Sequence, residues 1–343
     1  MYNPSWLLPL IIFDLVMVLN WFRAARRQRW QRHPPAATTM PPFENQQTAH
    51  SDPPRSPYNE DEIVQLIKDI YRTYLRLNYI KRWELVWPPK DTGHVINAAL
   101  CEELGLEPAV VSLMKRIPYF YDSSTSRNVE FHEYSRAMVY LEDAEIRGGR
   151  DPDLFEIQEP RLDYLLPRDI ALICTEDQGG NIILDTKANT IRVQDFLYLP
   201  PGPDRPPDYD YRPERVDDEG HYRNYYAHHA PTWLAAWLEK IKSLEFIPVN
   251  SKGDRSLKVE GEQGGAVLKD ILQKKYGWPD SFREAEWRRA GSNICWQVGQ
   301  CTMDNLEIPD EFEVDTAHDE EEAMAFSGRV AYAEEIDGPR GEL

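Results

Sequence analysis

Apolar residues recur every three or four positions soon after residue 59, which is the spacing of one face of an α-helix. The repeated positions are Ile63, Leu66, Ile67, Ile70, Tyr74 and Leu77. Asn59 can cap such a helix, and the acidic residues 60–62 complement the dipole of its first turn. The pattern predicts an amphipathic helix that begins at Asn59 and packs against another layer.

Helical patterns predict five later segments, at residues 95–104, 108–116, 232–246, 265–276 and 281–289. Gly105 separates the first two segments, and Gly277 and Pro279 separate the last two. The segment 232–246 follows a proline and carries Trp233 and Trp237 on its apolar side, as expected of a helix that covers a core.

Three short runs predict strands, at residues 170–175, 181–186 and 190–196. Runs rich in β-branched residues and separated by turns that contain glycine are typical of an antiparallel meander. Residues 182–184 are continuously apolar, which indicates cover on both faces of the middle strand. Together with the helices, these runs predict an α+β fold in which an antiparallel or mixed sheet of about four to six strands packs against helices.

Residues 6–22 form an apolar run with a single charge, Asp14, and five arginines follow it within ten residues. This length is at the short limit for crossing a bilayer of about 30 Å. The arginines lie only on the carboxyl side, so the positive-inside rule predicts a single-pass anchor with the following domain in the cytosol. The anchor residues are Trp6, Leu10, Phe13, Val16 and Trp21. A targeting peptide or a buried segment of a cytoplasmic protein are the alternatives.

Composition predicts how the rest of the chain is organised. Residues 1–33 hold the anchor and its basic flank, and residues 34–57 form a disordered, proline-rich linker. An α+β domain occupies residues 58–250 and carries a surface loop at 199–230. An additional helical segment follows at 251–303, and residues 304–343 form an acidic, mostly disordered tail.

The net charge of −19 is unevenly distributed. Residues 1–50 sum to +3 and residues 304–343 to −12, which leaves −10 in the middle of the chain. A negative middle repels a phosphate backbone, so we predict no nucleic-acid partner. Four scattered cysteines, Cys101, Cys174, Cys295 and Cys301, are too few for a disulfide framework and indicate a reducing compartment. We expect no metal site and no cofactor.

Candidate chemistry lies in the loop 199–230, where His221, His228 and His229 follow the acidic residues 217–219. Imidazoles beside carboxylates can serve acid–base catalysis or hold a metal, so a hydrolase or metal-dependent enzyme is one alternative function. Tandem histidines in a loop are more often solvated surface. The sequence has no nucleophile elbow, Walker loop, dinucleotide glycine pattern, zincin helix or kinase signature, and we predict no catalytic residue.

The same loop is rich in tyrosine. Tyr209, Tyr211, Tyr225 and Tyr226, with Trp233 beyond them, are candidate partner-binding residues because aromatic side chains dominate interface hot spots. Packing of the loop onto its own domain is the alternative interpretation.

The order of these elements resembles the SUKH superfamily, which includes fungal cell-wall-assembly regulators and bacterial toxin-immunity proteins. The resemblance covers about residues 58–247 and rests on the IALICTEDQGGNIILDTK hairpin, a strand ending in Asp195 and the closing helix APTWLAAWLEKIKSL. Gly179, Gly180, Leu184 and Asp185 fall where such proteins carry a turn and an apolar strand. The chain also resembles uncharacterised proteins of filamentous ascomycete fungi. The resemblance implies binding and regulation rather than catalysis.

These observations favour a non-enzymatic interaction or regulatory protein that is tethered to a membrane and binds an unidentified protein. Two other classes stay open. One is the enzyme that uses the histidine loop, and the other is a structural protein without a dedicated partner, whose acidic tail aids solubility.

Overall fold

The computed structural model describes residues 55–152, 160–175, 179–195, 202–206, 213–218, 220–252, 254–262, 264–304, 306–307, 309 and 312. The chain divides into two units, Met1–Pro53 and Pro54–Leu343, and every described residue belongs to the second unit. The predicted membrane anchor, most of the linker and most of the acidic tail therefore lie outside the described residues.

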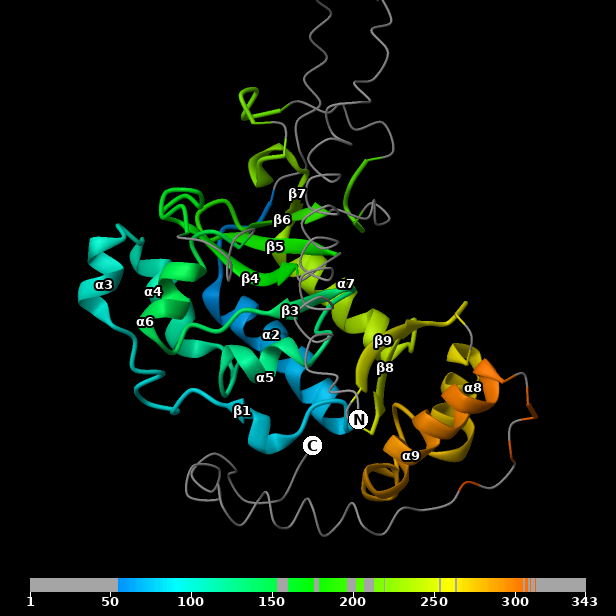
Figure 1. The fold of residues 1–343 in the computed structure, drawn as a ribbon. Coiled ribbons are helices and arrows are strands. Elements are labelled where there is room, and N and C mark those ends of the chain that lie inside the picture. Colours follow the sequence, from blue (N-terminus) through cyan, green and yellow to red (C-terminus); the bar gives the residue numbers. More distant parts are fainter. Residues whose placement is uncertain are drawn as a thin grey trace, which may run out of the picture. The chain divides into compact units, whose positions relative to one another are not determined.

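Helices and strands alternate along the described chain (Figure 1). The helices are α2 (Glu60–Arg76), α3 (Ala98–Glu103), α4 (Pro108–Arg116), α5 (Ser123–Arg127), α6 (Asp143–Gly148), α7 (Ala230–Lys242), α8 (Gly265–Asp270) and α9 (Glu284–Met303). Single helical turns are η1 (Arg82–Glu84), η2 (Tyr222–Asn224) and η3 (Ile271–Lys275). The strands are β1 (Leu85–Val86), β2 (Tyr119–Phe120), β3 (Ser135–Ala137), β4 (Asp169–Thr175), β5 (Gly180–Asp185), β6 (Thr190–Asp195), β7 (Ala227–His229), β8 (Phe246–Ser251) and β9 (Asp254–Val259).

The main sheet has five antiparallel strands in the order β3-β4-β5-β6-β7. Its centre is the predicted meander of β4, β5 and β6, which is confirmed almost residue for residue. The edge strands β3 and β7 have three residues each and were not predicted, because so short a run shows no alternation of apolar and polar positions. The predicted α+β fold is confirmed.

Strand β5 is enclosed on all sides. It pairs with β4 along one edge and with β6 along the other, and all six of its residues are buried. The turn before it requires Gly179, whose φ of +93° suits glycine. A Cβ atom there would also lie 2.6 Å from the carbonyl oxygen of Glu133. This explains the glycine-containing turn that the sequence predicted.

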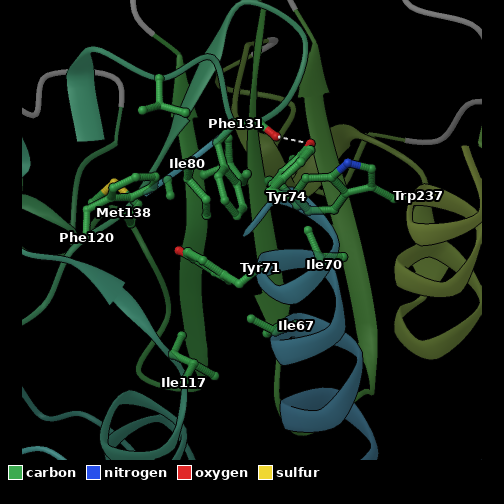
Figure 2. Close-up of a cluster of buried hydrophobic side chains, with 14 of the residues drawn as sticks. Ile67, Ile70, Tyr71, Tyr74, Ile80, Ile117, Phe120, Phe131, Met138 and Trp237 are labelled. Carbon is green, nitrogen blue, oxygen red and sulfur yellow. Dashed lines mark hydrogen bonds between the residues drawn. The ribbon is translucent and has the colours of Figure 1, made fainter. Parts of the chain in front are cut away.

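Helices α2 and α7 pack together and cover one face of the sheet (Figures 1 and 2). Figure 2 shows Ile67, Ile70 and Tyr71 of α2 facing Trp237 of α7 and Phe131. Asn59 caps α2 as predicted, since its side chain accepts a hydrogen bond from the backbone N–H of Asp61. The core is closely packed, because its cavity of about 20 Å³ has room for no more than one water molecule.

The sequence extended the helix at α7 too far. The helix ends at Lys242, and Leu244 turns the chain in a left-handed conformation with φ of +57°. Phe246, which was predicted to be helical, begins strand β8. Strand β8 is buried along most of its length, so its residues do not alternate between apolar and polar. An apolar run of this kind cannot be distinguished from a helix end by its period.

The predicted domain boundary at residue 250 falls inside β8 and is wrong. Strand β8 pairs with β9 across that position, and α9 packs against β8. The indole N–H of Trp287 on α9 donates a 2.7 Å hydrogen bond to the carbonyl oxygen of Leu77, at the end of α2. The segment after residue 250 is thus joined to the first helix of the fold.

Candidate functional site

The carboxyl half of the predicted surface loop is built into the domain. Strand β7 adds to the edge of β6, so that Ala227, His228 and His229 become part of the sheet. The turn η2 lies just before it, with Tyr222 buried. The prediction of an irregular surface loop is wrong for this half, because its aromatic side chains pack inward and its backbone completes the ladder.

Tyr222 and Arg223 cover a group of charged side chains on the sheet. The hydroxyl of Tyr222 donates a 2.6 Å hydrogen bond to Oδ2 of Asp169 on β4. Arg223 forms ion pairs with Asp185 at 3.1 Å and with Glu214 at 2.9 Å. Asp169 and Asp185 are directly opposite each other in neighbouring strands, so the guanidinium group of Arg223 separates two carboxylates that would otherwise repel.

Two more arginines balance the charges of this network. Arg168 lies 3.1 Å from Asp185, and Arg192 lies 2.5 Å from Glu214. Three carboxylates therefore face three guanidinium groups. Asp169, Asp185 and Arg192 are buried, whereas Glu214 is exposed at the edge of the network. The ion pairs join Glu214 and Arg223 to the strands of the sheet.

The pKa values of Asp169 and Asp185 are shifted in opposite directions. Burial raises the pKa of Asp169 to about 6, although the hydrogen bond from Tyr222 partly offsets this. Burial also raises the pKa of Asp185, but hydrogen bonds from the backbone N–H of Ala188 and from Arg168 outweigh it and hold that pKa below its ordinary value. One oxygen of Asp169, Oδ1, is buried without a hydrogen-bond partner. Asp169 is thus the carboxylate of the pair whose burial is less well compensated by hydrogen bonds.

The three histidines have separate partners. The ring of His221 is buried between Tyr164 and Tyr222, and its Nδ1 accepts a hydrogen bond from the backbone N–H of Arg223. Burial lowers the pKa of His221. Nδ1 of His228 lies 2.5 Å from Oδ1 of Asp204. Within the described residues, no group of three or more histidine, cysteine, aspartate or glutamate side chains is arranged to hold a metal ion.

His229 lies beside two hydroxyl groups. Its Nε2 is 3.0 Å from Oγ of Ser56, and its Nδ1 is 2.8 Å from Oγ1 of Thr232. Oδ2 of Asp204 accepts a 2.7 Å hydrogen bond from the backbone N–H of His229. Ser56, Asp204 and Thr232 were not among the predicted site residues. Ser56 lies 173 positions from His229, and no spacing in the sequence signals a contact over that distance.

The predicted partner-binding residues do not form an exposed aromatic face in the described structure. Trp233 and Tyr226 are buried, and Tyr225 is half-buried. The hydroxyl of Tyr226 donates to the carbonyl oxygen of Asp204, and Trp233 packs edge-on against Trp237. Tyr209 and Tyr211 lie outside the described residues. Packing onto the domain is the interpretation that fits Tyr226 and Trp233.

An exposed apolar stripe lies instead at the carboxyl end of α9. It consists of Trp296, Met303 and Leu306, whose exposed fractions are 38%, 66% and 62%. The ammonium group of Lys252 lies 4.0 Å from the centre of the Trp296 ring. The sequence pattern predicted this helix only as far as residue 289, whereas it extends to Met303. Gly291 is helical, and the ring of Trp287 lies where its Cβ would be.

Comparisons with family models, curated proteins and solved structures found no match for this chain. No helix of the described part of the chain is both long and apolar enough to cross a membrane. The predicted anchor residues Trp6, Leu10, Phe13, Val16 and Trp21 lie outside that part.

Proposed function

We propose that this chain is a non-enzymatic interaction domain, tethered to a membrane by residues 6–22 and facing the cytosol, which binds a protein partner through the α9 stripe. The observation that carries the proposal is the exposure of Trp296 and Met303 on α9 and of Leu306 just beyond its end. Aromatic residues and methionine are enriched at protein interfaces. A resemblance to the SUKH superfamily would fit the same role.

The charges around the stripe favour a partner whose surface is basic. Asp304 and Glu307 are exposed beside Met303 and Leu306, and residues 304–343 carry a net charge of −12. Opposite charges guide association and fix orientation. We therefore propose a partner whose surface combines apolar side chains with lysine or arginine.

Site-specific photo-crosslinking in the full chain tests the proposal. A photoreactive residue at position 303 or 306 is expected to give one discrete adduct, whose captured peptide contains basic and apolar residues. The matched control is position 102, an exposed residue of α3. Equal adducts at positions 102 and 303, or none at position 303, would contradict the proposal. Extraction of the full chain by alkali into the soluble fraction would contradict the membrane tether separately.

One specific contact favours a hydrolase as a second candidate function. Ser56 and His229 lie at the distance of a nucleophile and its general base, and Thr232 orients the other ring nitrogen. The orienting group is a hydroxyl rather than a carboxylate, and the core cavity is not lined by Ser56 or His229. Labelling of the full chain by a fluorophosphonate, abolished in both S56A and H229Q, would favour this candidate over the binding domain.

A further inference from the structure

Ser56 has the accessibility and the sequence of a protein kinase substrate. Its side chain is exposed, and residues 55–59 belong to neither helix nor strand. Pro57 follows it and favours an extended backbone at Ser56. Kinases that require proline after the acceptor find a single candidate here, since no other Ser–Pro or Thr–Pro pair occurs in the 343 residues.

The domain already holds this segment through a buried amide. Nδ2 of Asn189 donates to the carbonyl oxygens of Ser56 and Pro57 at 3.1 and 3.3 Å, and it lies 3.5 Å from Oγ of Ser56. The exposed fraction of Asn189 is 0%, and its backbone is left-handed with φ of +54°. A donor fixed in this way keeps the Ser56 hydroxyl beside the sheet edge.

The groups around the Ser56 hydroxyl suit a phosphate. Nε2 of His229 lies 3.0 Å away, and His229 is the residue that precedes helix α7. The imidazole of His229 and the amide of Asn189 are thus two side-chain groups in contact with the Ser56 hydroxyl.

The nearest negative charge is partly compensated. Asp204 accepts a hydrogen bond from the backbone of His229, but its other oxygen is 2.5 Å from the ring of His228. Arg55 adds a positive charge next to Ser56, and its guanidinium group stacks 5.9 Å from the ring centre of Tyr226. A phosphate on Ser56 would therefore lie beside Arg55 and the ring of His229, while Asp204 is held by the His228 ring and the His229 backbone.

We propose that Ser56 is phosphorylated by a proline-directed serine/threonine kinase, and that the phosphoserine is held by the side chain of His229. In the reaction, Oγ of Ser56 bonds to the γ-phosphorus of ATP, the bond from that phosphorus to ADP breaks, and the hydroxyl proton passes to the kinase. The modification fixes residues 55–57 to the domain. The proposal does not depend on the α9 stripe or on the membrane anchor.

Phosphorylation of the purified full chain tests the acceptor. A proline-directed kinase with MgATP is expected to add one phosphoryl group at Ser56, and S56A and P57A are expected to lose it. A peptide of residues 50–62 is the control for the kinase. Modification of the peptide but not of the folded chain would overturn the proposal.

The binding of the phosphate is measured by ³¹P resonance, since the modified chain has a single phosphorus atom. The second ionisation of free phosphoserine has a pKa of about 6. In the phosphorylated chain its midpoint is expected to lie about half a pH unit lower than in the phosphopeptide, because a hydrogen bond from the ring of His229 stabilises the dianion. The H229Q variant is expected to recover most of this difference. Coincident titrations of chain and peptide would overturn the proposal, even if H229Q failed to fold.

Discussion

His132 is a histidine that the fold keeps uncharged. Its ring packs against Trp233, Trp237 and Phe246 at 5.1–6.0 Å between ring centres. Burial, with a smaller effect of Lys240, lowers the pKa of His132 to about 3. A charged imidazole has no favourable place in this aromatic cage, so acid must protonate His132 at the expense of the folded state.

This burial makes the stability depend on pH in a defined window. Because the folded pKa of His132 is below its ordinary value of 6.5, the stability is fully present above pH 6.5 and is lost as the pH falls toward 3. Between pH 7.5 and 4.5 we expect a loss of about 3 kcal/mol, at about 1.4 kcal/mol per pH unit below 6.5. Urea denaturation at both pH values measures it, and H132F should not show this part of the loss. Equal losses in both proteins would contradict the prediction.

The effect of Asp169 on the pH dependence of stability is opposite to that of His132. Its folded pKa of about 6 is above the ordinary value of 3.8, so its contribution to stability is present below pH 3.8 and is lost as the pH rises through 6. The difference corresponds to about 3 kcal/mol at about 1.4 kcal/mol per pH unit. We expect D169N, which still accepts the Tyr222 hydrogen bond, to gain stability relative to the wild type between pH 4 and 7. An unchanged difference over this range in thermal or urea denaturation would argue against it.

At the scale of elements, α9 is joined to α2 by Trp287. The ring is almost fully buried and its N–H binds the carbonyl oxygen of Leu77. W287A should lower the free energy of unfolding by about 3–5 kcal/mol, as expected for a large buried ring. W287F keeps most of the packing and should lose about 1–3 kcal/mol, because the Leu77 carbonyl is left unsatisfied. Urea denaturation measures both losses. Losses that were equal, or larger in W287F than in W287A, would contradict the importance of the Trp287 contact.

The sequence predicted the elements whose pattern is local. Helix α2 begins at the predicted cap, and β4, β5 and β6 match because each shows its own period and turn residues. Elements with no period of their own were missed, such as β3 and β7, whose strands exist because a neighbour offers a free edge. Helix α9 was predicted only as far as residue 289, whereas it continues through Gly291, where the missing Cβ makes room for Trp287.

The candidate site was less predictable than the fold. The histidines were found because of their residue type, but their partners lie far away in the sequence, as Ser56 does from His229. Burial also decided the outcome for Tyr226 and Trp233, and composition alone does not distinguish an aromatic core from an aromatic surface. Asp185 was noted only at an apolar strand and Asp169 was not singled out, since their opposition depends on the register of β4 and β5.

At the scale of the whole molecule, the second unit is expected to fold as one body that includes α9. A chain that ends after Asn250 would lose the partner of β8 and expose its buried residues Phe246, Ile247 and Val249. We expect this truncated chain to be unfolded or insoluble, whereas one that ends after Phe312, which still packs against the core, should unfold at the same urea concentration as the full chain. Circular dichroism with urea checks both, and an independently folded chain ending at 250 would restore the predicted boundary.

Because β5 is enclosed, hydrogen exchange of its amides can report ligand binding. Amides at Ile182, Ile183 and Leu184 are covered on both faces and bonded along both edges, so their exchange with deuterated water should require global unfolding. Any molecule that binds only the folded state slows this exchange, by about a hundredfold at a concentration one hundred times its Kd. Three amides at the centre of the sheet can thus reveal a ligand wherever on the folded domain it binds.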